Sequence, residues 1–148
     1  MTKENNFITA YERHAAILGE VGETNKATVF DVLAAATITS VIVEFDGEGD
    51  SGGIESVSAR RGDMAVKLPA DGVPFDQVDF GADAPVTTLN PLREAIESLC
   101  YDYLFHYHGG WENNDGAYGT FTFNVAARTI ELEFNERFTD VTTSTHEF

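Results

Sequence analysis

The chain has little cysteine, few basic residues and no long apolar run, and each of these scarcities excludes a class of protein. The single cysteine, Cys100, has no intrachain partner, which excludes a disulfide framework and a multi-cysteine metal site. It lies on the apolar face of an expected helix, where a buried thiol is inert. No apolar run is long enough to cross a membrane, and residues 1–6 are polar. We therefore expect neither a membrane span nor a signal peptide, and the sequence predicts a cytoplasmic protein.

The scarcity of basic residues is the strongest compositional feature. Nine Lys and Arg stand against 25 Asp and Glu, for a formal net charge of −16. Because nucleic-acid backbones are bound by clustered Lys and Arg, direct binding to nucleic acid is not expected. The same charge attracts basic proteins and metal cations. The composition favours a cationic partner, and simple solubility or adaptation to high salt is the alternative explanation for the acidity.

Apolar residues, in contrast, are plentiful and are spread along the whole chain. The 148 residues are 43% hydrophobic and include 11 Phe and 5 Tyr, which is enough for a packed core. No internal repeat, low-complexity tract or proline-rich linker divides them. The sequence therefore predicts a single domain over residues 1–148.

The spacing of these apolar residues predicts the secondary structure. Helical spacing appears in three segments, residues 5–18, 24–36 and 91–108, with Gly19 and Gly22 allowing a turn between the first two. Alternation predicts five strands, over residues 40–45, 54–59, 64–68, 121–125 and 130–134. The order ααβββαββ is typical of the α+β class. We expect an antiparallel sheet of about five strands with helices packed on one face.

Acidic side chains alternate with apolar ones in the predicted strands. Glu44, Glu131 and Glu133 therefore point away from the core, toward an open and wet face of the sheet. Because a strand rises about 3.3 Å per residue, such carboxylates recur every 6–7 Å or so. A row of this kind suits a cationic surface. The first functional hypothesis is a non-enzymatic protein that binds a basic or nucleic-acid-binding protein, as a nucleic-acid mimic or inhibitor.

A glycine-rich acidic loop at residues 46–53 carries the candidate metal ligands. Its acidic oxygens occupy positions one, three and five, as in a calcium-binding EF-hand loop, but Ser51 replaces the glycine at position six and strands flank it. Asp46, Asp50 and Glu55 are the candidate ligands for calcium or magnesium, with an ordinary solvated turn as the alternative.

Residues 49–53 also match the serine signature of chymotrypsin-like proteases. The chain is too short for that fold and lacks its histidine motif, so an enzyme is not favoured.

A second loop, residues 109–119, contains the only Trp and four consecutive amide or carboxylate side chains. Its polar residues and glycines also suit tight turns, and its Trp could hold the loop on the core. Together with the strand carboxylates, it completes the set of candidate binding residues, which is Glu44, Glu48, Trp111, Glu112, Asn113, Asn114, Asp115, Glu131 and Glu133. The second hypothesis is a small metal-binding module or enzyme in which this loop meets residues 46–55, with Glu112 and Asp115 adding oxygen ligands or an acid/base pair.

The two loops also carry a family resemblance. Residues 45–55, the Gly-Trp-Glu-Asn-Asn-Asp-Gly run at residues 110–116 and the closing hairpin resemble an uncharacterised family of small bacterial proteins, over roughly residues 24–148. The resemblance implies a domain of unknown function associated with mobile elements and phage-related genes. It implies no catalytic residues for this chain.

Overall fold

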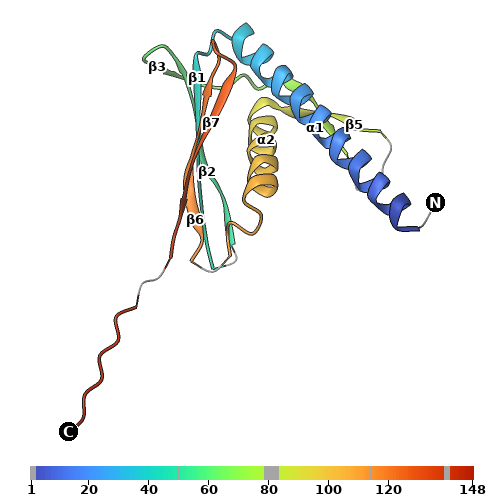
Figure 1. Ribbon diagram of the computed structural model, residues 1–148. Helices are drawn as coiled ribbons and strands as arrows, with labels where there is room; N and C mark the ends of the chain where they lie inside the picture. Colours follow the sequence, from blue (N-terminus) through green and yellow to red (C-terminus); the bar gives the residue numbers. More distant parts are fainter. Residues whose placement is uncertain (1–2, 50, 79–83, 114, 139–140) are drawn as a thin grey trace.

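A five-stranded antiparallel sheet forms one layer of the protein, and the two described helices lie on one side of it (Figure 1). The computed structural model describes residues 3–49, 51–78, 84–113, 115–138 and 141–148, with backbone alone for residues 3–15 and 18. The strands are β1 (Ser40–Glu48), β2 (Ser51–Arg61), β3 (Met64–Val66), β6 (Ala117–Asn124) and β7 (Thr129–Glu136), in the order β3-β2-β1-β6-β7. The predicted α+β class is confirmed.

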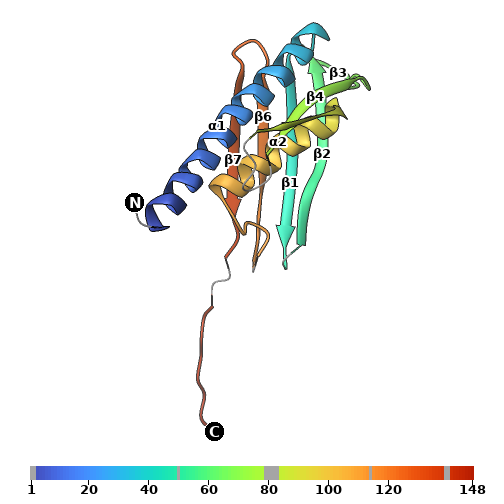
Figure 2. The same ribbon diagram turned by 90° about the vertical axis from the view of Figure 1, so that its right-hand side faces the viewer.

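The helices are α1 (Lys3–Ala35) and α2 (Leu92–Tyr107). The prediction of two N-terminal helices is wrong, because α1 continues through Gly19 and Gly22. A glycine inside a helix costs only about 1 kcal/mol and does not end it. The buried stripe also crosses this point, with one residue every four positions at Val21, Asn25, Val29 and Leu33. Figure 2 shows α1 running obliquely on the same side of the sheet as α2.

A small second sheet, β4 (Gly72–Gln77) with β5 (Val86–Pro91), lies between β3 and α2 in the chain. The sequence did not predict it, because β4 offers only two alternating apolar residues, Val73 and Phe75, around Pro74. Both of these side chains are buried in the core that α1 and α2 share. The hairpin is thus stabilised by packing rather than by its own strand signal.

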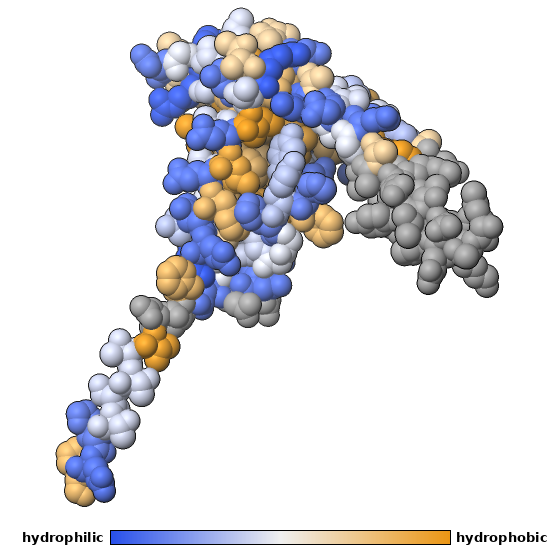
Figure 3. Space-filling model, viewed as in Figure 1, coloured by the Kyte–Doolittle hydropathy of each residue, from blue (hydrophilic) through white to orange (hydrophobic). Residues whose placement is uncertain are grey.

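The core fills the space between the large sheet and the helices. The sheet contributes Val41, Val43, Phe45, Phe121 and Phe123, all of them buried. Figure 3 shows hydrophobic atoms between the two layers and hydrophilic atoms on the other side of the sheet. Cys100 lies in this core on α2, where burial, and then the charge of Glu97, raises the pKa of its thiol. The prediction of a buried thiol is confirmed.

Asn25 is a buried polar residue that connects α1 to the small sheet. It is 2% exposed, its amide nitrogen donates to the Asp76 carbonyl at 3.0 Å, and its Oδ1 accepts the Asp76 N–H at 2.9 Å. We expect Asn25→Ala to lower the free energy of unfolding by about 2–3 kcal/mol, because it leaves both main-chain groups unpaired. Urea unfolding measures this loss.

The neighbouring Thr24 provides a matched control. Its hydroxyl is exposed and donates to the Glu20 carbonyl of the same helix. Thr24→Ala should change the free energy of unfolding by no more than about 0.5 kcal/mol. Equal losses in the two variants would contradict a tertiary role for Asn25.

Candidate functional site

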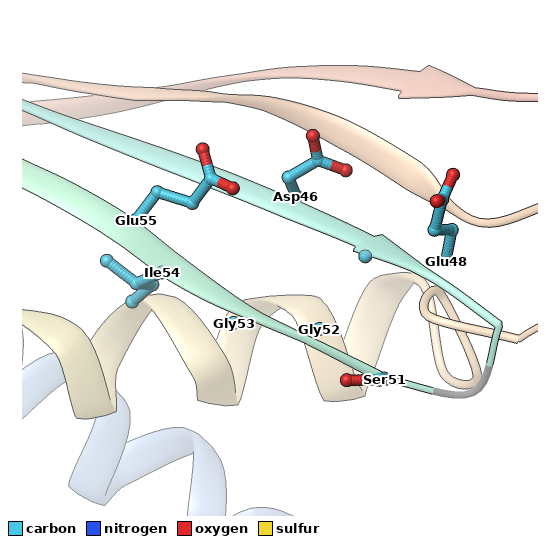
Figure 4. Close-up of a pocket in the computed structure, with 8 residues that line it drawn as sticks. Asp46, Glu48, Ser51, Gly52, Gly53, Ile54 and Glu55 are labelled. Atoms are coloured by element: carbon cyan, nitrogen blue, oxygen red, sulfur yellow. The ribbon is translucent and has the colours of Figure 1, made fainter.

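The β1–β2 hairpin is longer than the sequence suggested. The loop predicted over residues 46–53 is mostly strand, because Asp46 pairs with Gly53, Gly47 with Gly52 and Glu48 with Ser51. A bulge between Glu44 and Phe45 leaves Glu55 without a partner in the register. Figure 4 shows Asp46, Glu48 and Glu55 pointing away from α2. The acidic residues here are therefore side by side on strands and do not encircle a loop, and Asp50 lies outside the described residues.

Two glycines of this hairpin, Gly47 and Gly52, lie beneath the Trp111 ring. A Cβ on Gly47 would lie 2.6 Å from Cζ3 of Trp111, and one on Gly52 would lie 2.9 Å from its Cη2. The ring also meets Phe45 edge-on, with centroids 5.3 Å apart. Trp111 is half-buried and packs against the core. The absence of side chains at Gly47 and Gly52 thus has a packing reason. It matches the alternative considered for residues 109–119, that Trp111 holds this second loop on the core.

The two acidic loops do meet, as the second hypothesis required. Gly116 has a φ of +79°, and a Cβ there would overlap the Gly47 carbonyl oxygen. Close by, the Arg137 main-chain N–H donates to the Gly116 carbonyl at 2.9 Å, and its guanidinium donates to the Gly47 carbonyl at 3.2 Å. Backbone contacts and one arginine therefore join residues 46–48 to residues 111–116.

Arg137 also neutralises one candidate metal ligand. Its guanidinium lies 2.8 Å from Oδ1 of Asp46 and stacks over the Tyr118 ring at 4.6 Å from the centroid. The hydrogen bond to Asp46 is the main cause that raises the pKa of Arg137. Sequence reasoning missed this residue. The available signal was a basic side chain directly after an acidic strand in a chain with few basic residues.

Two of the other loop residues, Asn113 and Asp115, line one hollow with Trp111 and Arg137. Glu112 is half-buried with its Cβ on the helix side of Gly47, and Asn113 and Asp115 are exposed. Asn114 lies outside the described residues. Across the part of the chain that the structure describes, no three His, Cys, Asp or Glu side chains form a group that could hold a metal ion.

The open face of the sheet brings the predicted strand carboxylates together. Cross-strand register places Glu133 opposite Thr120, and Thr120 opposite Glu44, so the two glutamates share a row two strand spacings wide, about 10 Å. Ser56 continues the row and donates a hydrogen bond to Glu44 at 3.2 Å. The next row holds Glu131 and Thr122. Glu44, Glu131 and Glu133 are exposed, as their alternation predicted.

Asp46, Glu48 and Glu55 extend this surface toward the end of the β1–β2 hairpin (Figure 4). We call the six residues Glu44, Asp46, Glu48, Glu55, Glu131 and Glu133 the acidic face. Both helices lie on the opposite side of the sheet (Figures 1 and 2), and no described helix or strand covers the acidic face. The structure thus unites residues that the sequence had assigned to two different sites.

The fold and this surface define a small acidic α+β protein with one open sheet face and two loops joined through a tryptophan. The chain matches the Family of unknown function (DUF6878) over residues 21–148, and it belongs to that family. The resemblance to a domain of unknown function is thereby confirmed. No curated protein and no solved structure matches the chain. Among the described helices, none has the length and apolar character needed to span a membrane.

Proposed function

We propose that this protein is a non-enzymatic binding protein whose acidic face engages a basic or nucleic-acid-binding protein in the cytoplasm. The observation that supports the proposal is the gathering of six carboxylates on one uncovered face of the sheet. Among the described residues, Asp46 is the only one of the six that forms an ion pair, with Arg137. Such a face attracts a cationic surface over about one Debye length, roughly 8–10 Å at moderate salt.

The hydroxyls between the carboxylates suit the same partner. Thr120, Thr122 and Ser56 lie beside Glu44, Glu131 and Glu133 in the cross-strand rows. Carboxylates form charge-assisted hydrogen bonds with Lys and Arg, and neutral hydroxyls fill the space between them without adding repulsion. A protein that binds nucleic acid presents Lys and Arg of this kind to phosphates. Our proposal therefore includes a nucleic-acid mimic or inhibitor, of the type that mobile elements would carry.

Calcium or magnesium binding near residues 46–55 is the weaker alternative. It is supported by the common direction of Asp46, Glu48 and Glu55 in Figure 4. A cation would have to displace Arg137 from Asp46, which costs this ion pair. Calorimetric titration with both ions tests this alternative, and saturable binding to the wild-type protein would favour it.

Charge reversal at Glu131 and Glu133 tests the proposed function. The double change Glu131→Lys with Glu133→Lys should weaken binding of an oligolysine peptide at low salt by at least tenfold or so, because two attractive charges become repulsive. Both side chains are exposed, so the fold should persist. Fluorescence anisotropy at low and high salt measures the binding, and circular dichroism checks the fold.

Glu20 and Glu23 provide the matched control, since both are exposed on α1 and away from the acidic face. Reversing them to Lys changes the net charge by the same amount. Binding should then fall only slightly, through the overall charge. If both double variants lost binding equally, the acidic face would have no special role. No loss in the Glu131/Glu133 variant would contradict the proposal outright.

A further inference from the structure

We propose that the free edge of β7 accepts an extended basic segment of the partner as an additional strand. This inference rests on the proposed function and specifies how the acidic face holds its partner. β7 is an edge strand of the five-stranded sheet, and no strand of the described residues pairs with its outer side. An unpaired strand edge is a template for main-chain hydrogen bonds from another chain.

The register identifies the main-chain groups that are available. Arg137 donates its N–H to Gly116 in continuation of the β6–β7 pairing, so odd-numbered residues of β7 bond β6. Hydrogen-bonding direction alternates along an antiparallel strand. The N–H and C=O groups of Ile130, Leu132, Phe134 and Glu136 therefore point outward. The edge offers four residues in the spacing that an added strand requires.

The two faces of the edge differ in chemistry. Ile130, Leu132 and Phe134 are half-buried on the helix side, while Glu131 and Glu133 are exposed on the acidic face. In Figure 3, which looks onto this edge, hydrophobic atoms form a column along the sheet with hydrophilic atoms on its outer side. Side chains of paired strands contact each other across the same face. The matching segment therefore alternates apolar residues with Lys or Arg.

A second copy of this chain does not fit the same edge. Antiparallel pairing of two β7 strands about Leu132 would place Glu131 opposite the copy's Glu133, and like charges directly opposite each other destabilise a sheet. Each chain also carries a net charge of −16. A basic segment meets neither obstacle. The charge pattern of the edge thus selects a cationic strand over self-association.

The other free edges lack this combination. On β2, beyond its pairing with β3, a bulge interrupts the strand and the Tyr101 hydroxyl already accepts the Ile54 N–H at 2.8 Å. β5 has the sequence Val-Thr-Thr-Leu-Asn-Pro and no charged residue. β3, at the other end of the large sheet, contains only Met64–Val66 and no carboxylate, and the Asp76 main chain of β4 is already bonded to Asn25. Among these described edges, β7 alone combines outward main-chain groups, an apolar row and carboxylates.

A synthetic peptide of alternating Lys and Val, with blocked ends, is the probe. Its control is an isomer of the same composition with the Lys and the Val in separate blocks, so that the charge is equal and the pattern differs. The alternating peptide should bind the full chain at least tenfold or so more tightly. In its complex, the amides of Leu132 and Phe134 should become protected from hydrogen exchange, because they then bond the peptide.

N-methylation of the peptide separates the strand mode from plain charge attraction. In an added strand, the main-chain amides of alternate peptide residues face β7, so either the Val amides or the Lys amides bond it. Methylating the amides that face β7 should weaken binding at least tenfold or so, and methylating the other amides should leave binding unchanged. If block and alternating peptides bind equally, or both methylated sets bind alike, the edge proposal is wrong and the acidic-face proposal stands. If wild-type protein binds neither peptide at low salt, both proposals fail.

Discussion

Replacing Gly116 by alanine should destabilise the protein by about 2–5 kcal/mol, because two separate costs add at this position. Its φ of +79° is a left-handed conformation that costs an L-residue roughly 1–2 kcal/mol. In addition, the new Cβ would overlap the Gly47 carbonyl oxygen, so the β1–β2 hairpin would have to move. Overpacking of this kind typically costs about 1–3 kcal/mol. Urea unfolding measures the sum.

Gly49 separates the two costs. It has a similar φ of +61°, but nothing lies within 4 Å of the position its Cβ would take. Gly49→Ala should therefore lose only the backbone part, roughly 1–2 kcal/mol. The difference between the two variants is the cost of the clash between the loops. Equal losses would mean that the close approach of Gly116 to Gly47 does not occur in solution.

Trp111→Ala should cost about 2–4 kcal/mol, less than for a fully buried Trp because the indole is half-buried. The ring lies against Phe45, Gly47 and Gly52, and its removal leaves a space that glycines cannot fill. Phe105 on α2 is the matched control, since this residue is 82% exposed. Phe105→Ala should change the free energy of unfolding by no more than about 0.5 kcal/mol.

The same variant also tests the predicted binding role of Trp111. If the ring acts only by joining the loops, Trp111→Ala should still bind oligolysine at a temperature where it is folded. Normal stability combined with lost binding would instead make Trp111 a binding residue, as the sequence suggested. The pair of measurements therefore decides between the two interpretations of the second loop.

The parts of the fold that follow a local period were predictable. The alternation around Glu44, Glu131 and Glu133 placed them on the open face, because successive side chains of a strand point to opposite sides. The apolar stripe of α2 identified a helix whose Leu99 and Leu104 are buried. Each of these predictions needs only the neighbouring residues.

Other parts depend on contacts between distant segments. The β4 strand is short, and it is held by packing and by Asn25 of α1, 51 residues away. α1 continues through Gly22, with buried residues on both sides of the glycine at Val21 and Asn25. A local pattern contains no trace of either contact. These are the two places where the predicted element order differs from the structure.

The sequence by itself determined that the protein is acidic, that it belongs to the α+β class and which way Glu44, Glu131 and Glu133 point. Tertiary structure alone decided that Glu44 and Glu133 share a row across β6, that Arg137 neutralises Asp46 and that β7 forms an open edge. The physical reason is the separation along the chain between the residues that interact. Side-chain direction follows from a two-residue period, whereas strand order and loop contacts arise from pairings between segments far apart in the chain.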